Sequence, residues 1–394
     1  MKTQLLVVCD GVPVPPLNGH TRKVYDMIKA VCDQYSISVF VYGDEAIGRS
    51  VQEHWRGSGV QWTFEPKRGF SSYFGMLAGR VPLPTARRNF NRELSWVKEK
   101  MATTVRSVLF IDFINGSPLA ANFKEGVVIS GHDCMSHLFR QERIASKSVK
   151  QKLHFTVREY LVRTLERKFA HRCQFLHLVS SEDAERFRRV NPAINPSVIP
   201  IGGPKPSPTS LRGWDERSGG IIWGNLNSQP IADGLVRLLP LFKDKELSGW
   251  QLIGSVAPEV VQQRFPEVYR VGLSYHPRVP DISTCLGEAR YLFLPDTTGT
   301  GQKNRCVDGL AHGCCVFGLP EVFRGMGAEK CYVCEATFEL LVSRLRAAVS
   351  NQEDMRGVAS NGANLFLSEF SSDVLREKWV KLFDFCASLT LNER

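Results

Sequence analysis

Residues 291–326 combine side chains and backbone features that can bind a phosphate group. An apolar segment, residues 291–294, leads into a loop rich in Gly and Thr, residues 297–301, and Lys303 then precedes a helical pattern that contains Asp308. The N-terminus of a helix presents unpaired backbone N–H groups and a positive dipole end, and both attract an anion. Lys303 adds a cation, and a carboxylate such as Asp308 accepts hydrogen bonds from sugar hydroxyls. The stretch therefore suits a nucleoside diphosphate sugar, although an ordinary strand–loop–helix connection with two solvated charges would have the same local sequence.

Two commoner phosphate-binding motifs do not fit this stretch. A P-loop needs Ser or Thr directly after its Lys, but Asn304 follows Lys303. A dinucleotide-binding fingerprint needs a third Gly where Asn304 stands. The loop is therefore predicted to bind phosphate in another way, or not at all.

Short apolar segments alternate with helical patterns along the chain. The predicted strands are residues 5–9, 36–42, 108–111, 127–130, 176–179 and 198–201 in the first half, and 221–223, 250–253, 291–294 and 315–317 in the second. The predicted helices include residues 22–32, 88–101, 150–171, 231–242, 303–311, 337–350 and 370–385. This alternation predicts an α/β fold with parallel sheets that are covered on both faces, and such sheets build their sites at the carboxyl ends of the strands.

The length of 394 residues suits two domains. Residues 201–220 are rich in Pro, Gly and Ser, which is typical of a linker. We therefore expect one Rossmann-like domain over residues 1–200 and a second over residues 221–368. Residues 369–394 contain a final amphipathic helix with Ser371 or Ser372 as its N-cap.

The composition is that of a globular protein, with 43% hydrophobic and 23% charged residues. No apolar run approaches the roughly 20 residues that a bilayer-spanning helix needs, and the first ten residues, MKTQLLVVCD, predict a buried strand rather than a signal peptide. The eleven Cys favour a reducing, cytoplasmic location. The sequence has no H-E-x-x-H or Asp-x-Asp motif, and its single CxxC lies in a strand-like segment, so no metal site is predicted.

Positive charge is concentrated in the first part of the chain. Residues 1–218 contain 32 Lys and Arg against 20 Asp and Glu, whereas the remaining residues contain 18 against 20, which favours a polyanionic partner for the first part. Residues 147–172 form a basic helical pattern whose apolar residues recur every four positions and predict a core-facing stripe: Leu153, Val157, Leu161, Leu165 and Phe169. The polar side of this helix would be solvated, or would rest on anionic lipid headgroups together with four nearby arginines: Arg80, Arg87, Arg88 and Arg92.

The loop and helix of residues 295–317 resemble the donor site of family 4 glycosyltransferases, which are retaining enzymes with the two-domain GT-B fold. Their pattern resembles P-x-x-x-G-x-G-x-K-N-K-x-x-E-A-M-A-x-G-x-P-V-V, and seven residues of this chain match it: Pro295, Gly299, Gly301, Lys303, Asn304, Ala311 and Gly313. Arg305 replaces a Lys, Asp308 replaces the acid, and Thr300 stands where many relatives have a first Glu. The resemblance implies that Asp308 binds the ribose hydroxyls and that the loop with Lys303 lies by the phosphates.

Three further segments carry the resemblance. Residues 13–27 are similar to the family's P-x-x-G-G-x-x-R loop, which implies that Gly19 and Arg22 lie near the donor phosphates. Residues 127–137 place His132 and Asp133 directly after a predicted strand, and in similar enzymes a His at this loop contacts the transferred sugar.

The third segment, residues 221–230, is similar to the strand and turn that open the family's second domain. This similarity implies that Gly224 and Asn225 face the donor. The Arg and Lys that better-known relatives have just beyond this turn are missing, so Lys303 and Arg305 would have to neutralise the diphosphate.

Together these similarities imply a retaining, metal-independent hexosyltransferase of the GT-B fold, with its C-terminal helix crossing back to the first domain. It would need no cofactor, and it would act on a saccharide or lipid-linked acceptor in polysaccharide or glycolipid synthesis, in the cytoplasm and at the inner face of an anionic membrane. Two alternatives share the fold: a nucleotide-sugar epimerase and a catalytically silent binding protein. A nucleic-acid binder is disfavoured because the sequence has no helix-turn-helix, RNA-binding aromatic motif or zinc finger.

Overall fold

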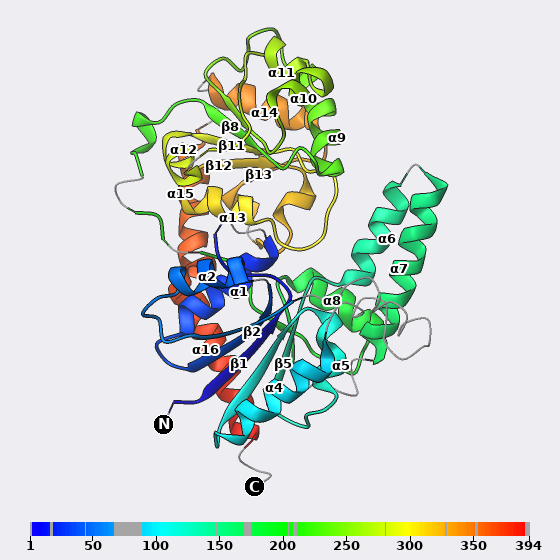
Figure 1. The fold of residues 1–394 in the computed structure, drawn as a ribbon. Helices are drawn as coiled ribbons and strands as arrows, with labels where there is room; N and C mark the ends of the chain where they lie inside the picture. Colours follow the sequence, from blue (N-terminus) through cyan, green and yellow to red (C-terminus); the bar gives the residue numbers. More distant parts are fainter. Residues whose placement is uncertain are drawn as a thin grey trace. The chain divides into compact units, whose positions relative to one another are not determined.

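The computed structural model describes residues 2–15, 19–43, 45–66, 89–146, 148–168, 175–203, 205–207, 211–279, 281–327, 329–350 and 354–390. The chain forms two units, of which unit 1 comprises Met1–Pro200 with Leu375–Arg394 and unit 2 comprises Ile201–Val374. Each unit is built around its own parallel β-sheet (Figure 1).

Unit 1 contains a seven-stranded sheet in the order β3-β2-β1-β4-β5-β6-β7. Its strands are β1 Gln4–Cys9, β2 Ser36–Tyr42, β3 Gln61–Glu65, β4 Ser107–Asp112, β5 Val127–His132, β6 Phe175–Leu178 and β7 Ser197–Val198. The prediction missed β3 and placed β7 a residue late and two residues too long. Both lie at edges of the sheet, where β3 is only half-buried and the sequence lacks a continuous apolar run.

Helices cover both faces of this sheet. They are α1 Gly19–Val31, α2 Glu45–His54, α4 Phe90–Ala102, α5 Ser117–Ala120, α6 Met135–Ala145, α7 Val149–Lys168, α8 Ser181–Val190 and α16 Ser372–Leu389, with the 3-10 turn η3 Ile114–Gly116. Helices α1 and α16 pack on one apolar face of the sheet, and α4, α5 and α8 pack on the other.

The C-terminal helix α16 belongs to the core of unit 1 from Leu375 onward. The ring centroids of Trp379 and Phe383 lie 5.8 and 6.1 Å from that of Phe110 on β4. The Tyr35 hydroxyl donates a hydrogen bond of 2.6 Å to Asp384. The predicted return of the last helix to the first part of the chain is therefore confirmed.

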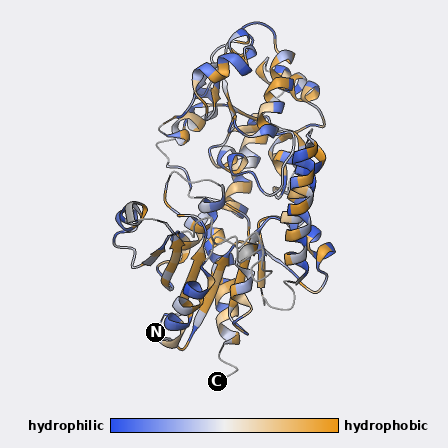
Figure 2. Ribbon diagram, turned by 45° about the vertical axis from the view of Figure 1, so that its right-hand side comes forward, coloured by the Kyte–Doolittle hydropathy of each residue, from blue (hydrophilic) through white to orange (hydrophobic). Residues whose placement is uncertain are grey.

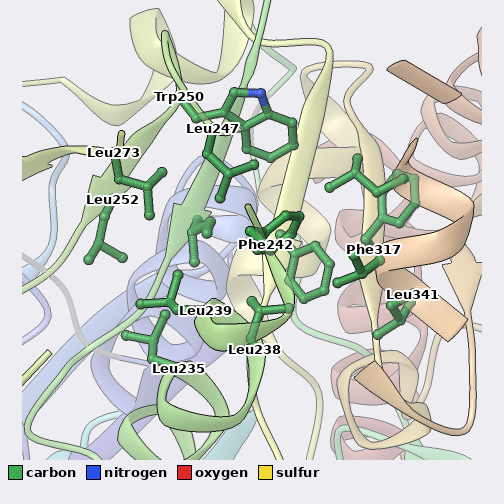
Figure 3. Close-up of a cluster of buried hydrophobic side chains, with 14 of the residues drawn as sticks. Leu235, Leu238, Leu239, Phe242, Leu247, Trp250, Leu252, Leu273, Phe317 and Leu341 are labelled. Atoms are coloured by element: carbon green, nitrogen blue, oxygen red, sulfur yellow. The ribbon is translucent and has the colours of Figure 1, made fainter. Parts of the chain in front are cut away.

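Unit 2 contains a six-stranded sheet in the order β10-β9-β8-β11-β12-β13. Its strands are β8 Gly220–Trp223, β9 Gln251–Ile253, β10 Ser274–His276, β11 Tyr291–Leu294, β12 Cys315–Gly318 and β13 Val333–Cys334. The helices are α9 Gln229–Leu238, α10 Pro258–Arg264, α11 Glu267–Arg270, α12 Ile282–Glu288, α13 Asn304–Ala311, α14 Phe338–Val349 and α15 Arg356–Leu365, with η6 Trp214–Glu216, η7 Leu239–Leu241, η8 Pro320–Phe323, η9 Glu329–Cys331 and η10 Phe366–Phe370. Figure 3 shows one core of this unit, which contains Leu235 and Leu238 of α9 together with Trp250 and Phe317.

The predicted core-facing stripe of α7 is wrong at its first two positions. Leu153 and Val157 are exposed, Leu161 and Leu165 are half-buried, and Phe169 lies outside the described residues, as do Arg80, Arg87 and Arg88. Helix α7 packs against α6, so only one side of it is covered. A four-residue repeat drifts by about 40° per step around a helix of 3.6 residues per turn, so it does not stay on that side. Among the described residues, no helix combines the length and the apolar character that crossing a bilayer requires.

The base of the α6–α7 pair contains a buried carboxyl group, Glu166. Its Oε1 accepts a hydrogen bond of 3.0 Å from the backbone N–H of Ser136. Its side chain is inaccessible to solvent, and burial raises the pKa of Glu166 to about 7 despite that hydrogen bond. The folded state therefore favours the protonated carboxyl group.

We expect Glu166→Gln to flatten the pH dependence of stability. Because the folded pKa is raised, the contribution of Glu166 is fully present below the unfolded pKa of about 4.5 and is lost as the pH rises through about 7. Relative to the Gln variant, the wild type should lose up to about 3 kcal/mol of unfolding free energy between pH 4.5 and 8. Urea unfolding at both pH values measures this, and Glu99→Gln, an exposed acid on α4, is the matched control. Parallel pH profiles for wild type and Glu166→Gln would contradict the assignment.

Candidate functional site

A cluster of buried polar side chains lies at the carboxyl ends of β4 and β5 in unit 1. Asp112 ends β4, His132 ends β5, and Lys23 reaches them from α1. The Lys23 ammonium donates to Asp112 Oδ1 at 3.2 Å and also to the Ser130 hydroxyl. His20 Nε2 donates to Asp112 Oδ2 at 2.7 Å. One buried carboxylate is thus surrounded by an ammonium group and two imidazoles.

The backbone at the end of β5 directs His132 into this cluster. The register of β5 against β6 shifts between Ser130 and His132, and His132 has a positive φ of 61°. The ring of Phe113, which also has a positive φ of 72°, stacks on the His132 ring with centroids 4.5 Å apart. Such conformations are costly for residues other than Gly, and they persist where the surrounding structure holds a side chain in place for function.

The charges of the cluster follow from its burial. Burial alone would raise the pKa of Asp112, but Lys23, His132 and His20 hold it well below its ordinary value. Burial lowers the pKa of Lys23 to about 8, against the opposing effect of Asp112. Burial and the Lys23 charge together lower the pKa of His132 to about 4. At neutral pH the cluster therefore holds a carboxylate, an ammonium group and a neutral imidazole.

The Nε2 atom of His132 lies 2.8 Å from both Lys23 Nζ and Asp112 Oδ1. A neutral imidazole nitrogen serves one of these partners at a time: it accepts from the ammonium, or it donates to the carboxylate. Asp112 and Lys23 therefore determine which ring nitrogen of His132 carries the proton. This arrangement orients His132 and controls its protonation.

Three of these residues also have the chemistry of metal ligands. His20, Asp112 and His132 offer ligand atoms within 4.8 Å of one another. However, the Lys23 ammonium already contacts Asp112 and His132, so a cation compensates the carboxylate without a metal. The donor set fits the ammonium group better than it fits a second, divalent cation beside it.

The other predicted residues of unit 1 lie around this cluster. Gly19 is the first residue of α1, and Asp133 follows His132 and raises the pKa of Lys23 through its charge. Arg22 pairs with Asp26 on the same helix at 3.4 Å.

Lys23 and Asp112 were not predicted as site residues, although two signals in the sequence pointed to them. If Gly19 is the first Gly of the P-x-x-G-G-x-x-R pattern, the basic residue of the pattern lies four positions later, at Lys23 rather than at Arg22. The rule that placed His132 at the carboxyl end of a strand applies equally to Asp112 at the end of β4.

In unit 2 the predicted phosphate loop leads into the N-terminus of α13. Lys303 is the N-cap residue, its side chain makes no capping hydrogen bond, and its Nζ donates to the Thr300 carbonyl at 3.1 Å. Gly299 and Gly301 have φ values of 148° and 64°, which side chains rarely adopt, and a Cβ at Gly299 would collide with Lys303 Nζ. The loop therefore folds closely around the lysine ammonium and leaves the first N–H groups of α13 without a side-chain cap.

Arg305 has a different environment from Lys303. Its Nη2 donates to both carboxylate oxygens of Asp296, at 2.7 and 2.9 Å, and its Nη1 donates to the Trp223 carbonyl. Asp296 thus compensates the Arg305 charge, and the guanidinium connects the carboxyl ends of β8 and β11. Gly224 lies directly beside it, since a Cβ there would be 3.1 Å from Arg305 Nη1.

The remaining predicted donor residues surround the same end of the sheet. Asn225 is exposed, and its Oδ1 accepts hydrogen bonds from Asn227 N at 3.0 Å and from Ser255 Oγ at 2.5 Å. Asn304 begins α13, and its buried Oδ1 has no hydrogen-bond partner among the described residues. Asp308 lies one turn further along α13 and is half-buried.

Arg324, which was not predicted either, donates to the Gly299 carbonyl and supports the loop. Arg324 lies after β12, and no motif pointed to it. The structure thus gathers all the predicted donor residues of unit 2 at the carboxyl ends of β8 and β11.

A cavity of about 230 Å³ lies elsewhere in unit 2. It is lined mainly by apolar side chains, including Phe242, Leu247, Trp250 and Leu345, and by the Glu246–Arg346 ion pair. Trp250 immediately precedes β9, so this cavity lies toward the amino ends of the strands. Sites in parallel α/β sheets form at the opposite ends, so we assign the function to the α13 region rather than to this cavity.

Solved structures share the architecture of this chain. Sucrose-phosphate synthase from Thermosynechococcus elongatus superposes with a TM-score of 0.72 and 11% sequence identity, covering 98% of this chain and 100% of that one. HepE from Anabaena, in complex with UDP, has a TM-score of 0.67 and 13% identity, covering 97% of this chain and 100% of that one. WaaG, a glycosyltransferase involved in lipopolysaccharide biosynthesis, has a TM-score of 0.62 and 15% identity, covering 97% and 99%.

These structures define the fold of the chain, whereas sequence comparison identifies no relative. No protein-family model matches the chain, and no curated protein is significantly similar to it in sequence. The match extends over nearly the whole length of each solved structure and includes both sheets. The chain therefore has the GT-B fold, and the predicted fold class is confirmed.

Proposed function

We propose that this protein is a glycosyltransferase that moves a sugar from a nucleotide-sugar donor to an acceptor, with retention at the anomeric carbon. The observation that carries the proposal is the loop of residues 297–303, which folds around Lys303 at the uncapped N-terminus of α13. A helix N-terminus with an adjacent ammonium group is suited to a diphosphate. The shared fold supports the same conclusion, because HepE has been solved with UDP and with UDP-glucose.

In this proposal unit 2 binds the donor. Lys303 and the first N–H groups of α13 neutralise the diphosphate, and Asp308 accepts hydrogen bonds from the ribose hydroxyls. Asp296 already compensates the charge of Arg305, so Arg305 contributes by positioning the backbone at Gly224 and at the start of the loop. Thr300, Gly301, Asn304 and Asn225 complete the donor site. Neutralising the charge that develops on the departing diphosphate is the main catalytic contribution of these residues.

Unit 1 binds the acceptor in this proposal, and its buried cluster serves the reaction. His132 contacts the transferred sugar, with Asp133, Gly19 and Arg22 close by, while Asp112 and Lys23 set the orientation of His132. The acceptor hydroxyl attacks from the face that the diphosphate leaves, and the departing phosphate oxygen takes the hydroxyl proton. The acceptor is a saccharide or a lipid-linked saccharide at the inner face of the membrane, and we propose that no metal ion takes part.

Screening UDP-, GDP-, ADP- and TDP-sugars for thermal stabilisation tests donor binding, because a ligand that binds the folded state raises its stability by mass action. Incubating the stabilising donor with candidate acceptors, followed by mass spectrometry, tests transfer. We expect one nucleotide class to raise the melting temperature and an acceptor to gain the mass of one sugar residue. If none of the nucleotide sugars binds, the proposal is wrong.

A second candidate function is nucleotide-sugar binding without transfer. The compensated charge of Arg305 favours it, because Lys303 is then the main cation of the predicted phosphate loop. A donor that stabilises the protein but is neither transferred nor hydrolysed would support this alternative. A changed sugar on the released nucleotide would instead indicate an epimerase.

A further inference from the structure

The outward side of α7 carries large apolar side chains that no described residue of unit 1 covers. Val149, Leu153, Val157 and Tyr160 are 83%, 65%, 46% and 71% exposed. Their spacing of four, four and three residues places them on one stripe along the helix. Ile144, near the end of α6, is 68% exposed and extends the apolar surface toward the tip of the hairpin. A contiguous exposed patch of this kind marks an interaction site.

The stripe faces away from the rest of unit 1. Phe155 stacks on Phe139 of α6 with ring centroids 6.5 Å apart, and Val162 and Glu166 are buried. At about 100° per residue, these three lie roughly opposite the stripe on the helix. Figure 1 shows α6 and α7 projecting together from unit 1, and Figure 2 shows hydrophobic and hydrophilic segments alternating along both helices.

Cations flank the stripe on both sides. Lys150 lies on one side of it, Lys152 and Arg163 lie on the other, and all three are exposed. The only carboxylates in α7 are Glu159, which pairs with Arg143 of α6 at 3.0 Å, and the buried Glu166. Residues 135–168 contain nine Lys and Arg against three Glu. The exposed face of the hairpin is therefore apolar along its centre and positive at its edges.

We propose that the outward face of α7, with the tip of the hairpin, docks on the surface of an anionic lipid bilayer. A narrow apolar stripe flanked by Lys and Arg side chains suits the boundary between acyl chains and headgroups. Tyr160 has the amphipathic side chain favoured at that depth, and the Lys and Arg side chains reach the phosphates. A second copy of this chain is disfavoured as the occupant, because two identical basic faces repel each other.

Co-sedimentation of the full chain with lipid vesicles tests this proposal. The probes are phosphatidylcholine vesicles with and without phosphatidylglycerol. We expect binding only to the anionic vesicles, with binding weakening as salt is added. The double variant Leu153→Ser, Val157→Ser should reduce binding at least about tenfold, because it removes two apolar side chains from the centre of the stripe. The variant Lys150→Glu, Lys152→Glu should reduce it at least about twentyfold, because each basic residue near the surface contributes about a factor of five.

Matched control variants distinguish the contribution of the α7 face from general effects of surface hydrophobicity and charge. Val236→Ser with Val349→Ser removes two similarly exposed valines of unit 2, and Lys98→Glu with Lys381→Glu reverses two exposed lysines of α4 and α16. These controls should bind vesicles as the wild type does. The hairpin variants should keep the thermal stabilisation by donor nucleotide, so this test is independent of the proposed donor site.

Two results would overturn the proposal. One is equal binding of the wild type and both hairpin variants to anionic vesicles. The other is a wild type that does not bind vesicles and is a dimer by light scattering, while the double variant Leu153→Ser, Val157→Ser is a monomer. That second outcome would identify the stripe as an interface between copies of the chain.

Discussion

Replacing Lys303 with alanine should abolish the thermal stabilisation of the protein by its nucleotide donor. The Lys303 ammonium lies at the N-cap of α13 and donates to the Thr300 carbonyl at 3.1 Å. Charge-assisted hydrogen bonds to phosphate contribute about 1.5–3 kcal/mol each, so an ammonium that meets two phosphate oxygens is worth at least about 100-fold in Kd. At ligand concentrations about tenfold above the wild-type Kd, the stabilisation should fall from about 1.4 kcal/mol to about 0.1 kcal/mol.

The control for this prediction is Lys243→Ala, which removes an exposed lysine elsewhere in unit 2. Both variants should stay folded, because neither side chain is part of a core, and each is compared with its own unliganded form. Differential scanning fluorimetry with and without donor measures all three proteins. Full donor affinity in Lys303→Ala would show that the phosphate lies elsewhere.

Lys23→Met should destabilise unit 1 by about 3–5 kcal/mol, since it removes one partner of a buried ion pair and leaves the other charge behind. Lys23 is 2% exposed and Asp112 is inaccessible, so water cannot replace the lost contacts. The Asp112 carboxylate that remains should then stabilise the protonated form of a neighbouring histidine. The Lys23 charge helps to lower the pKa of His132 to about 4 in the wild type. The pKa of His132 should therefore be higher than this in the variant.

Urea unfolding measures the first effect, and NMR titration of the histidine ring protons measures the second. Lys29→Met on the same helix is the matched control, because Lys29 is exposed and its removal should cost less than about 0.5 kcal/mol. A Lys23→Met protein with wild-type stability and an unchanged His132 titration would contradict the described cluster. Full folding with loss of sugar transfer would instead assign Lys23 mainly to the reaction.

Local patterns in the sequence predicted most of the sheet strands and the site of unit 2. The strands β1, β2, β4, β5 and β11 are buried on both faces, so their apolar runs distinguish them from their surroundings. The loop of residues 297–303 and the start of α13 are contiguous, and their conformation depends on glycines and a helix end within a few residues. Such features are encoded by neighbours along the chain.

The unit 1 cluster and the exposed face of α7 were decided by the tertiary structure. Lys23 and Asp112 are 89 residues apart, and only the pairing of β1 with β4 and the packing of α1 bring them together. The apolar repeat of α7 suggested burial, but a helix in a two-helix hairpin is covered on one side only. Arg305 likewise gained a carboxylate partner through the folding of unit 2.

The sequence by itself therefore determined most of the segments that become strands and helices, because burial and capping depend on local residue type and spacing. The tertiary structure decided which charges meet and which apolar faces stay uncovered. Those outcomes depend on which distant elements pack together, and no local pattern contains that information.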